Sequence, residues 1–212
     1  DMAFRKNNTY KYESGETFTL SRSGIDSFIN CQRCFYLNKV GNIKDIGMPG
    51  FSLNSAHDEL MKKELDIYRE EGTAHPYMDN LDRNMVPFQH ENMEDWRNNR
   101  KGITYHHEAT DLIITGSVDD VWIDTDTEEL VIVEYKSTST TKDIDLNDGT
   151  PWKEQYKRQI DIYQWLFKMN GFKVASDSVF LYSNGLKTLN KFNDVLKFKT
   201  YILEYRGSTE WV

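Results

Sequence analysis

Hydrophobic and polar positions divide the chain into a first half with helical periodicity and a second half rich in strand patterns. In the first half, apolar residues recur at helical spacing from about Ser23 and again over 54–71, and a short helix is expected over 93–100. Ser23 with Asp26 three residues later forms a capping-box pattern, which predicts that the first helix begins there. Gly72 is expected to end the second helix.

The second half alternates strand patterns with one strong helix pattern. Strands are predicted over 103–109, 111–123, 129–136, 178–183 and one or two segments through Tyr205. Residues 124–127 are predicted as a hairpin turn, and Asn184-Gly185 as a second turn. The polar segment 138–150 predicts a loop, and the helix after it is expected to begin at Pro151 and to end before Gly171.

This order of elements predicts an α/β or α+β fold with a central mixed β-sheet of about five strands flanked by helices. The chain has 212 residues, of which 38% are hydrophobic, so it can bury a substantial core. No internal repeat or linker is evident. We therefore expect a single domain over 1–212, with a mainly helical part over 1–100 and the sheet with its core helix over 101–212.

Charge and composition narrow the class of protein. The net charge of −8 disfavours a protein that coats nucleic acid by bulk charge, but it leaves room for a local basic groove around an acidic centre. No apolar run reaches the roughly 18 residues of a membrane span, and the first residues lack the apolar segment of a signal peptide. The only cysteines, Cys31 and Cys34, predict a reducing, cytoplasmic or other intracellular setting.

The candidate chemistry lies where a buried strand meets charged residues. Val131-Ile132-Val133 predicts a buried strand that leads directly to Glu134 and Lys136, which share one face. Alternation along 111–123 places Asp119 on an otherwise apolar face of the neighbouring strand, so Asp119 and Glu134 are expected to converge. Two carboxylates in such a cleft suit Mg²⁺ or Mn²⁺, and a lysine beside them can hold or help to deprotonate a water. The alternative is a salt-bridge cluster at a sheet edge.

Two further features bear on this choice. Gln159 and Tyr163 lie on one stripe of the helix 151–170, and a glutamine facing the core needs a polar partner. His57 lies in the first turn of the helix 54–71 with apolar neighbours on the same side. Its position fits a structural role as well as a ligand.

In chain order, these residues resemble the PD-(D/E)XK nuclease superfamily, and within it the RecB/Cas4-like branch. The resemblance rests on a helix histidine, a G-x-x-D strand, an E-x-K strand and a Q-x-x-x-Y helix: His57, Gly116 to Asp119, Glu134 to Lys136, and Gln159 to Tyr163. The opening segment 21–40 is also similar to the N-terminal helix of that branch. The resemblance implies a restriction-endonuclease-like core.

The resemblance also implies a role for each residue. The metal ligands that it implies are His57, Asp119, Glu134 and the backbone carbonyl of Tyr135. Asp120 is the rival of Asp119, but alternation and the G-x-x-D spacing both favour Asp119. Lys136 would orient the attacking water and stabilise developing charge, with Asp119 and Glu134 as its catalytic partners. Gln159 and Tyr163 would position Lys136 or the nucleic-acid backbone.

The implied function is a nuclease dependent on Mg²⁺ or Mn²⁺ that hydrolyses DNA, as an exonuclease acting on DNA ends or single strands. DNA is the expected partner, together with a helicase, replication or repair protein, and no membrane. The alternative is a catalytically inactive nuclease-fold module that binds nucleic acid or a partner protein. Many members of the branch hold an iron–sulfur cluster on four cysteines. With Cys31 and Cys34 alone, no cluster is expected, and both are interpreted as free thiols on a helix.

Overall fold

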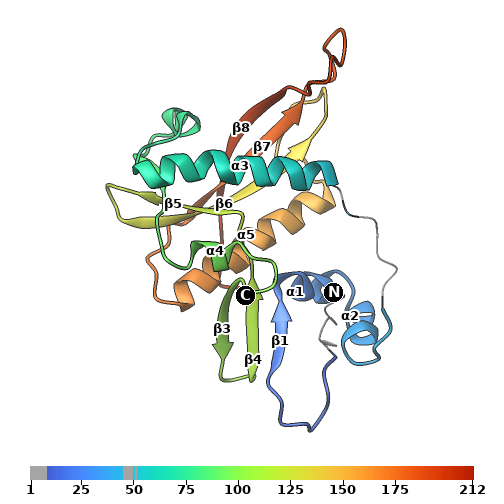
Figure 1. The fold of residues 1–212 in the computed structure, drawn as a ribbon. Helices are drawn as coiled ribbons and strands as arrows, with labels where there is room; N and C mark the ends of the chain where they lie inside the picture. The colour runs from blue at the N-terminus through green and yellow to red at the C-terminus, as the bar shows by residue number, and fades with distance from the viewer. Residues whose placement is uncertain (1–8, 45–49, 51) are drawn as a thin grey trace, which may run out of the picture.

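The computed structural model describes residues 9–44, 50 and 52–212 (Figure 1). Its elements in chain order are β1 (Phe18–Ser21), α1 (Arg22–Asn30), α2 (Gln32–Lys39), α3 (Ser52–Glu71), η1 (Pro76–Asn80), β2 (Met85–Pro87), α4 (Met93–Trp96), β3 (Ile103–His107), β4 (Leu112–Gly116), β5 (Asp120–Asp124), β6 (Glu129–Thr138), α5 (Pro151–Met169), β7 (Asp177–Gly185) and β8 (Phe198–Arg206). None of the described helices is long and apolar enough to cross a membrane.

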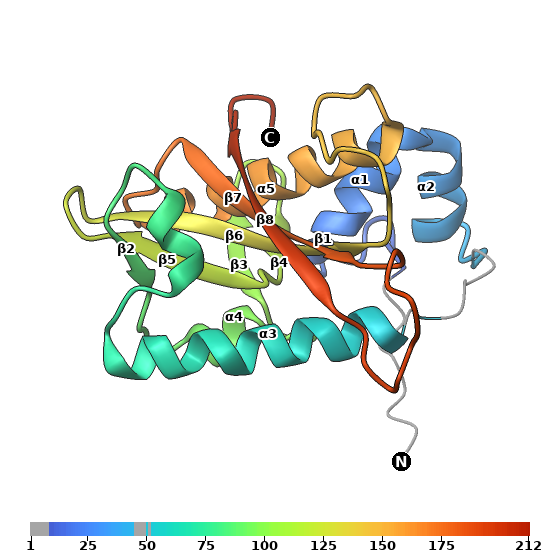
Figure 2. The same ribbon diagram turned by 90° about the horizontal axis from the view of Figure 1, so that it is seen from above.

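A five-stranded mixed sheet in the order β2-β5-β6-β7-β8 forms the centre of the fold. The central strand β6 runs antiparallel to β5 and parallel to β7. Helices α3 and α5 cover opposite faces of this sheet (Figure 2). Leu130 and Ile132 of β6 belong to the core cluster on the α5 face, whereas Val131 and Val133 belong to the cluster on the α3 face. The predicted fold class, a mixed sheet flanked by helices, is confirmed.

The segment predicted as one strand over 111–123 is two strands in two different sheets. β4 lies in a three-stranded sheet of order β1-β4-β3, whereas β5 belongs to the central sheet. The chain leaves the first sheet after Gly116, and the amide of Val118 donates to the carbonyl of Trp96 (3.1 Å) and not to a strand partner. As a result, Asp119 directly precedes the first residue of β5 and lies at the end of the paired strands β5 and β6.

Two predicted boundaries are also wrong. The first helix is capped by Ser21, whose side chain accepts a hydrogen bond from the amide of Gly24 (3.2 Å), so the cap lies two residues before the predicted Ser23 and the helix begins at Arg22. Asn184 and Gly185 are not a turn but the last residues of β7, where Asn184 is paired with Lys199. The side chain of Asn184 also bonds the backbone of Thr140, which holds this end of the strand in place.

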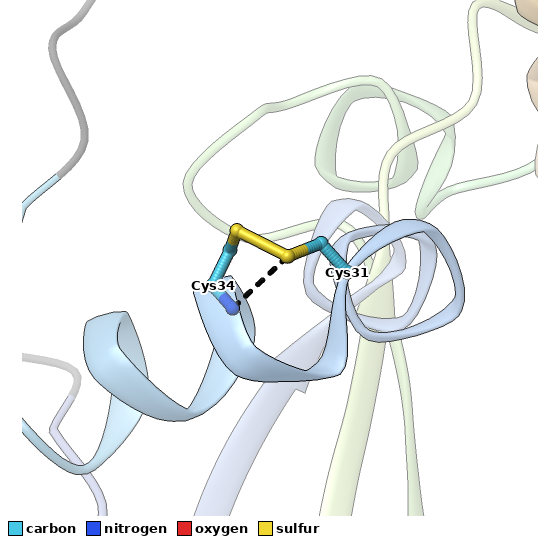
Figure 3. The surroundings of a disulfide bond; sticks show 2 residues. All are labelled: Cys31 and Cys34. Carbon is cyan, nitrogen blue, oxygen red and sulfur yellow. Dashed lines mark hydrogen bonds between the residues drawn. A yellow bond between two sulfur atoms is a disulfide. The ribbon is translucent and has the colours of Figure 1, made fainter.

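The interpretation of Cys31 and Cys34 as free thiols on a helix is corrected by the structure, which joins them in a disulfide (Figure 3). Cys31 interrupts the helical run, because it ends α1 and caps the start of α2. Its sulfur accepts a hydrogen bond from the amide of Cys34 (3.2 Å). The Cα atoms are 5.3 Å apart, which is an ordinary separation for a disulfide.

Candidate active site

Asp119 and Glu134 come together where β5 begins beside the middle of β6. The strands pair with Asp120 opposite Val133, so Asp119 is opposite Glu134 and their side chains leave the same face. The Glu134 side chain is only 4% exposed, while that of Asp119 is 22% exposed. The amide of Tyr135 donates to Asp119 Oδ2 (2.9 Å) and fixes this carboxylate beside β6.

Burial and mutual repulsion make it costly for both carboxylates to be ionised. Burial raises the pKa of Asp119, and the charge of Glu134 raises it further. Lys62, with its Nζ 3.7 Å from Asp119 Oδ1, opposes this shift only in part. Moreover, Glu134 Oε2 is buried and has no hydrogen-bond partner among the described residues. A second carboxylate beside this unpartnered oxygen gives two hard oxygen donors, which fit a divalent cation.

Lys136 is held by contacts on three sides. Its Nζ lies 2.5 Å from Glu134 Oε1, 3.5 Å from Gln159 Oε1 and 4.2 Å from the centre of the Tyr156 ring. Burial acts to lower the pKa of Lys136, but the carboxylates of Glu134 and Asp119 outweigh it and the pKa is raised. Lys136 is therefore an ammonium group at neutral pH. It can donate hydrogen bonds and stabilise negative charge, but it is a poor general base.

Glu134 of β6 is the polar partner that the core-facing Gln159 of α5 requires. Gln159 Nε2 donates to Glu134 Oε1 (2.7 Å) and to the hydroxyl of Tyr163 (3.1 Å). Tyr163 packs so closely on β4 that a Cβ added to Gly116 would lie 2.6 Å from its ring carbon Cε1. The glycine of the G-x-x-D segment thus makes room for the tyrosine of the Q-x-x-x-Y helix. Gln159 therefore contacts the site directly, through Glu134 and Lys136, and Tyr163 contacts it through Gln159.

Asp120 belongs to a different cluster, on the α3 face, which the sequence did not reveal. It is fully buried, and its carboxylate is bonded by Arg69 Nη2 (2.5 Å), Arg97 Nη2 (2.9 Å) and the hydroxyl of Tyr135 (2.8 Å). Burial acts to raise the pKa of Asp120, but Arg97 and Arg69 outweigh it and lower the pKa. Asp120 is thus occupied by partners within the fold, while Asp119 lies beside Glu134 in the candidate site.

His57 lies near the N-terminal end of α3, beside the C-terminal end of β6. Its Nδ1 is 3.1 Å from Asp58 Oδ1, and its ring centre is 5.1 Å from that of Phe198. Within the part of the chain that the structure describes, no three His, Cys, Asp or Glu side chains are grouped to hold one ion. The role of His57 as a metal ligand therefore stays a prediction, as do the roles of Asp119, Glu134 and Tyr135.

Fold and site together define a class of enzyme core, a mixed sheet whose central strand carries Glu134 and Lys136 opposite Asp119. Residues 51–206 match the family model of the PD-(D/E)XK nuclease superfamily, and the chain belongs to this superfamily. The matched region contains every residue of the candidate site. A comparison with curated proteins finds no relative that matches the chain.

Proposed function

We propose that this protein is a divalent-metal-dependent nuclease that hydrolyses phosphodiester bonds in DNA, as an exonuclease on ends or single strands. The observation that carries the proposal is the Asp119, Glu134 and Lys136 cluster within a PD-(D/E)XK fold. Assignment to the RecB/Cas4-like branch, and a helicase, replication or repair protein as partner, are further parts of the proposal. They rest on the resemblance of the motifs alone.

The carboxylates of Asp119 and Glu134 would hold Mg²⁺ or Mn²⁺, the ions that nucleases of this superfamily generally use. The backbone of Tyr135 can contribute as well. Its amide faces Asp119, and the carbonyl of a strand residue points to the same edge as its amide. When bound, the ion would supply positive charge opposite the phosphodiester and lower the pKa of a water.

The chain's own residues account for the rest of the chemistry. Lys136 orients the attacking water and stabilises the charge that develops on the phosphoryl oxygens. Gln159 donates a hydrogen bond to Oε1 of Glu134, which leaves Oε2 available to bind the metal ion. Tyr163, whose pKa is raised by burial and by the charge of Glu134, remains a neutral hydroxyl that positions Gln159.

A polar cavity of about 210 Å³ beside Tyr163 supports contact with a phosphate backbone. It is lined by residues that include Ser21, Arg22, Asn99, Arg100, Lys101 and Tyr163. Lys101 is itself paired with Asp95 (2.7 Å), and other cations are paired as well: Lys153 with Asp148 (2.6 Å), Lys157 with Glu154 (2.7 Å) and Arg158 with Asp26 (2.6 Å). The backbone is therefore expected to approach from the side of Arg22.

The alternative is an inactive nuclease-fold module that binds nucleic acid or a partner protein. The intact set of Asp119, Glu134 and Lys136 disfavours it, because an inactive site has no use for two adjacent carboxylates, one with a buried and unpartnered oxygen.

Linear and circular DNA distinguish these functions. With Mn²⁺ present, we expect end-labelled linear DNA to be degraded from its ends, while covalently closed circular duplex stays intact. Gel analysis of both substrates in one reaction is the measurement. Nicking or linearisation of the circle at a similar rate would contradict exonuclease action. Failure to cut either substrate with Mn²⁺ or Mg²⁺ would favour the inactive module.

A further inference from the structure

A second cavity, of about 380 Å³, opens at the C-terminal end of β6. Its lining includes Ser137 and Thr138, which directly follow Lys136, together with Gly185 of β7 and Phe198 of β8. The hairpin formed by β7 and β8 projects beyond the sheet here (Figure 1), and Phe198 at the start of β8 lies beside His57 of α3. The cavity therefore adjoins the candidate site along β6, where Ser137 is the next residue after Lys136. Its volume lies within the roughly 300–1,000 Å³ of small-molecule pockets.

The walls of this cavity differ in chemistry from one side to the other. Phe198 is 38% exposed, and its ring lies beside the ring of His57. Leu196, which is 42% exposed, extends the apolar wall. On the β6 side are Ser137 and Thr138, whose hydroxyls have no hydrogen-bond partner within the described parts of the chain; strand alternation places the Ser137 hydroxyl on the face of α3 and His57, while Thr138 offers its carbonyl oxygen near Gly185. A flat apolar wall opposite a hydroxyl and a backbone carbonyl matches a nucleobase, which has apolar faces and a polar edge.

We propose that this cavity receives an unpaired base of the strand whose phosphodiester lies at Glu134 and Lys136. The inference rests on the proposed nuclease function and deepens it, because it makes a single strand or a frayed end the preferred substrate. A base inside a duplex is stacked and paired, so it cannot enter a side pocket unless it is first extruded. Stacking on an aromatic ring recognises a base regardless of its identity, so the cavity selects for single-stranded character and not for sequence.

Gly185 keeps the floor of the cavity open. A Cβ added to Gly185 would lie 3.5 Å from Phe198 Cε1 and 3.6 Å from both Leu196 Cδ1 and the carbonyl oxygen of Thr138, which are ordinary contacts. The backbone angle φ of Gly185 is not positive, so a larger residue fits without backbone strain. The methyl groups of Gly185→Val would therefore occupy the space of the base and leave Asp119 and Glu134 untouched.

The test measures binding without cleavage, in a Lys136→Ala background with Mn²⁺. Fluorescence anisotropy compares a labelled single-stranded oligonucleotide, the same strand with abasic sites, and a blunt duplex of equal length. We expect abasic sites to weaken binding at least about fivefold. Gly185→Val and Leu196→Ala should each lower affinity for the intact strand towards that of the abasic strand, with the duplex within about twofold. Leu189→Ala, on the same hairpin, 44% exposed and outside the cavity lining, is the matched control.

Equal affinity for the intact and abasic strands in the parent protein would overturn the inference, whether or not the variants fold. Equal losses for single strand and duplex in Gly185→Val would also overturn it, as would the absence of any nucleic-acid binding. Cleavage of linear DNA by protein that retains Lys136 reports on the proposed function separately. Cutting without base-dependent binding refutes only the base pocket, whereas base-dependent binding without cutting refutes only the nuclease activity.

Discussion

Lys136→Ala is expected to lower the rate of DNA cleavage by about 10²–10³-fold while Mn²⁺ binding and DNA binding are largely retained. The ammonium of Lys136 is held 2.5 Å from Glu134 Oε1 and carries its charge at neutral pH. Its loss therefore removes stabilisation of charge that develops only in the transition state. The expected signature is a fall in kcat with little change in KM, measured by initial rates on end-labelled DNA.

Lys63→Ala is the matched control for this prediction. Lys63 is an exposed lysine on α3, paired with Glu59 at 2.6 Å, and its loss removes one positive charge from outside the cluster of Asp119, Glu134 and Lys136. It should leave kcat within about twofold, because an isolated exposed ion pair contributes little. Retention of the full rate by Lys136→Ala would show that the role assigned to Lys136 is wrong.

Asp120→Ala is expected to destabilise the fold by about 3–5 kcal/mol, because Arg69 and Arg97 would keep buried charges without their shared partner. Asp66, which also pairs with both arginines, is 39% exposed and compensates only in part. For a chain of this length the loss corresponds to a fall of about 10 °C in Tm. Thermal unfolding followed by circular dichroism measures it.

Asp119→Asn, one residue away, should behave in the opposite way. The folded state raises the pKa of Asp119, so the ionised group costs stability once the pH exceeds its unfolded value, and the cost is complete above the folded pKa. Replacement by Asn should raise the Tm of metal-free protein near and above neutral pH, with the gain vanishing below about pH 4. A large Tm loss in Asp119→Asn, with none in Asp120→Ala, would mean that the two aspartates have been assigned the wrong way round.

The sequence predicted which side chains share a face of the sheet better than it predicted where the strands begin and end. Glu134 and Lys136 follow an apolar run whose burial is evident from Val131 to Val133, so alternation alone places them together. Asp119 was assigned to the correct face although the strand 111–123 does not exist as one element. Asp119 lies two residues before Val121, whose side chain packs in the core cluster on the α5 face, so the two share that face. This spacing is the same whichever sheet contains the residues before Asp119.

Other features depend on contacts that no local pattern encodes. Arg69 on an amphipathic helix is expected to face solvent, yet its partner Asp120 lies 51 positions further along the chain. Its burial could be known only from the tertiary packing of α3 on the sheet. Similarly, the spacing of Cys31 and Cys34 fits both adjacent helical thiols and a disulfide, and nothing between α1 and α2, such as proline or glycine, marks the break at Cys31.

Calorimetric titration with Mn²⁺ tests most directly whether Asp119 and Glu134 form a metal centre. The wild-type protein should bind the ion, and Glu134→Gln should lose most of the affinity, because its amide replaces the unpaired oxygen Oε2. His57→Ala in the same titration decides whether the imidazole is a ligand: weaker binding supports it, and wild-type affinity removes it from the site. Equal Mn²⁺ affinity in the wild type and in Glu134→Gln would contradict the metal centre on which the proposed function depends.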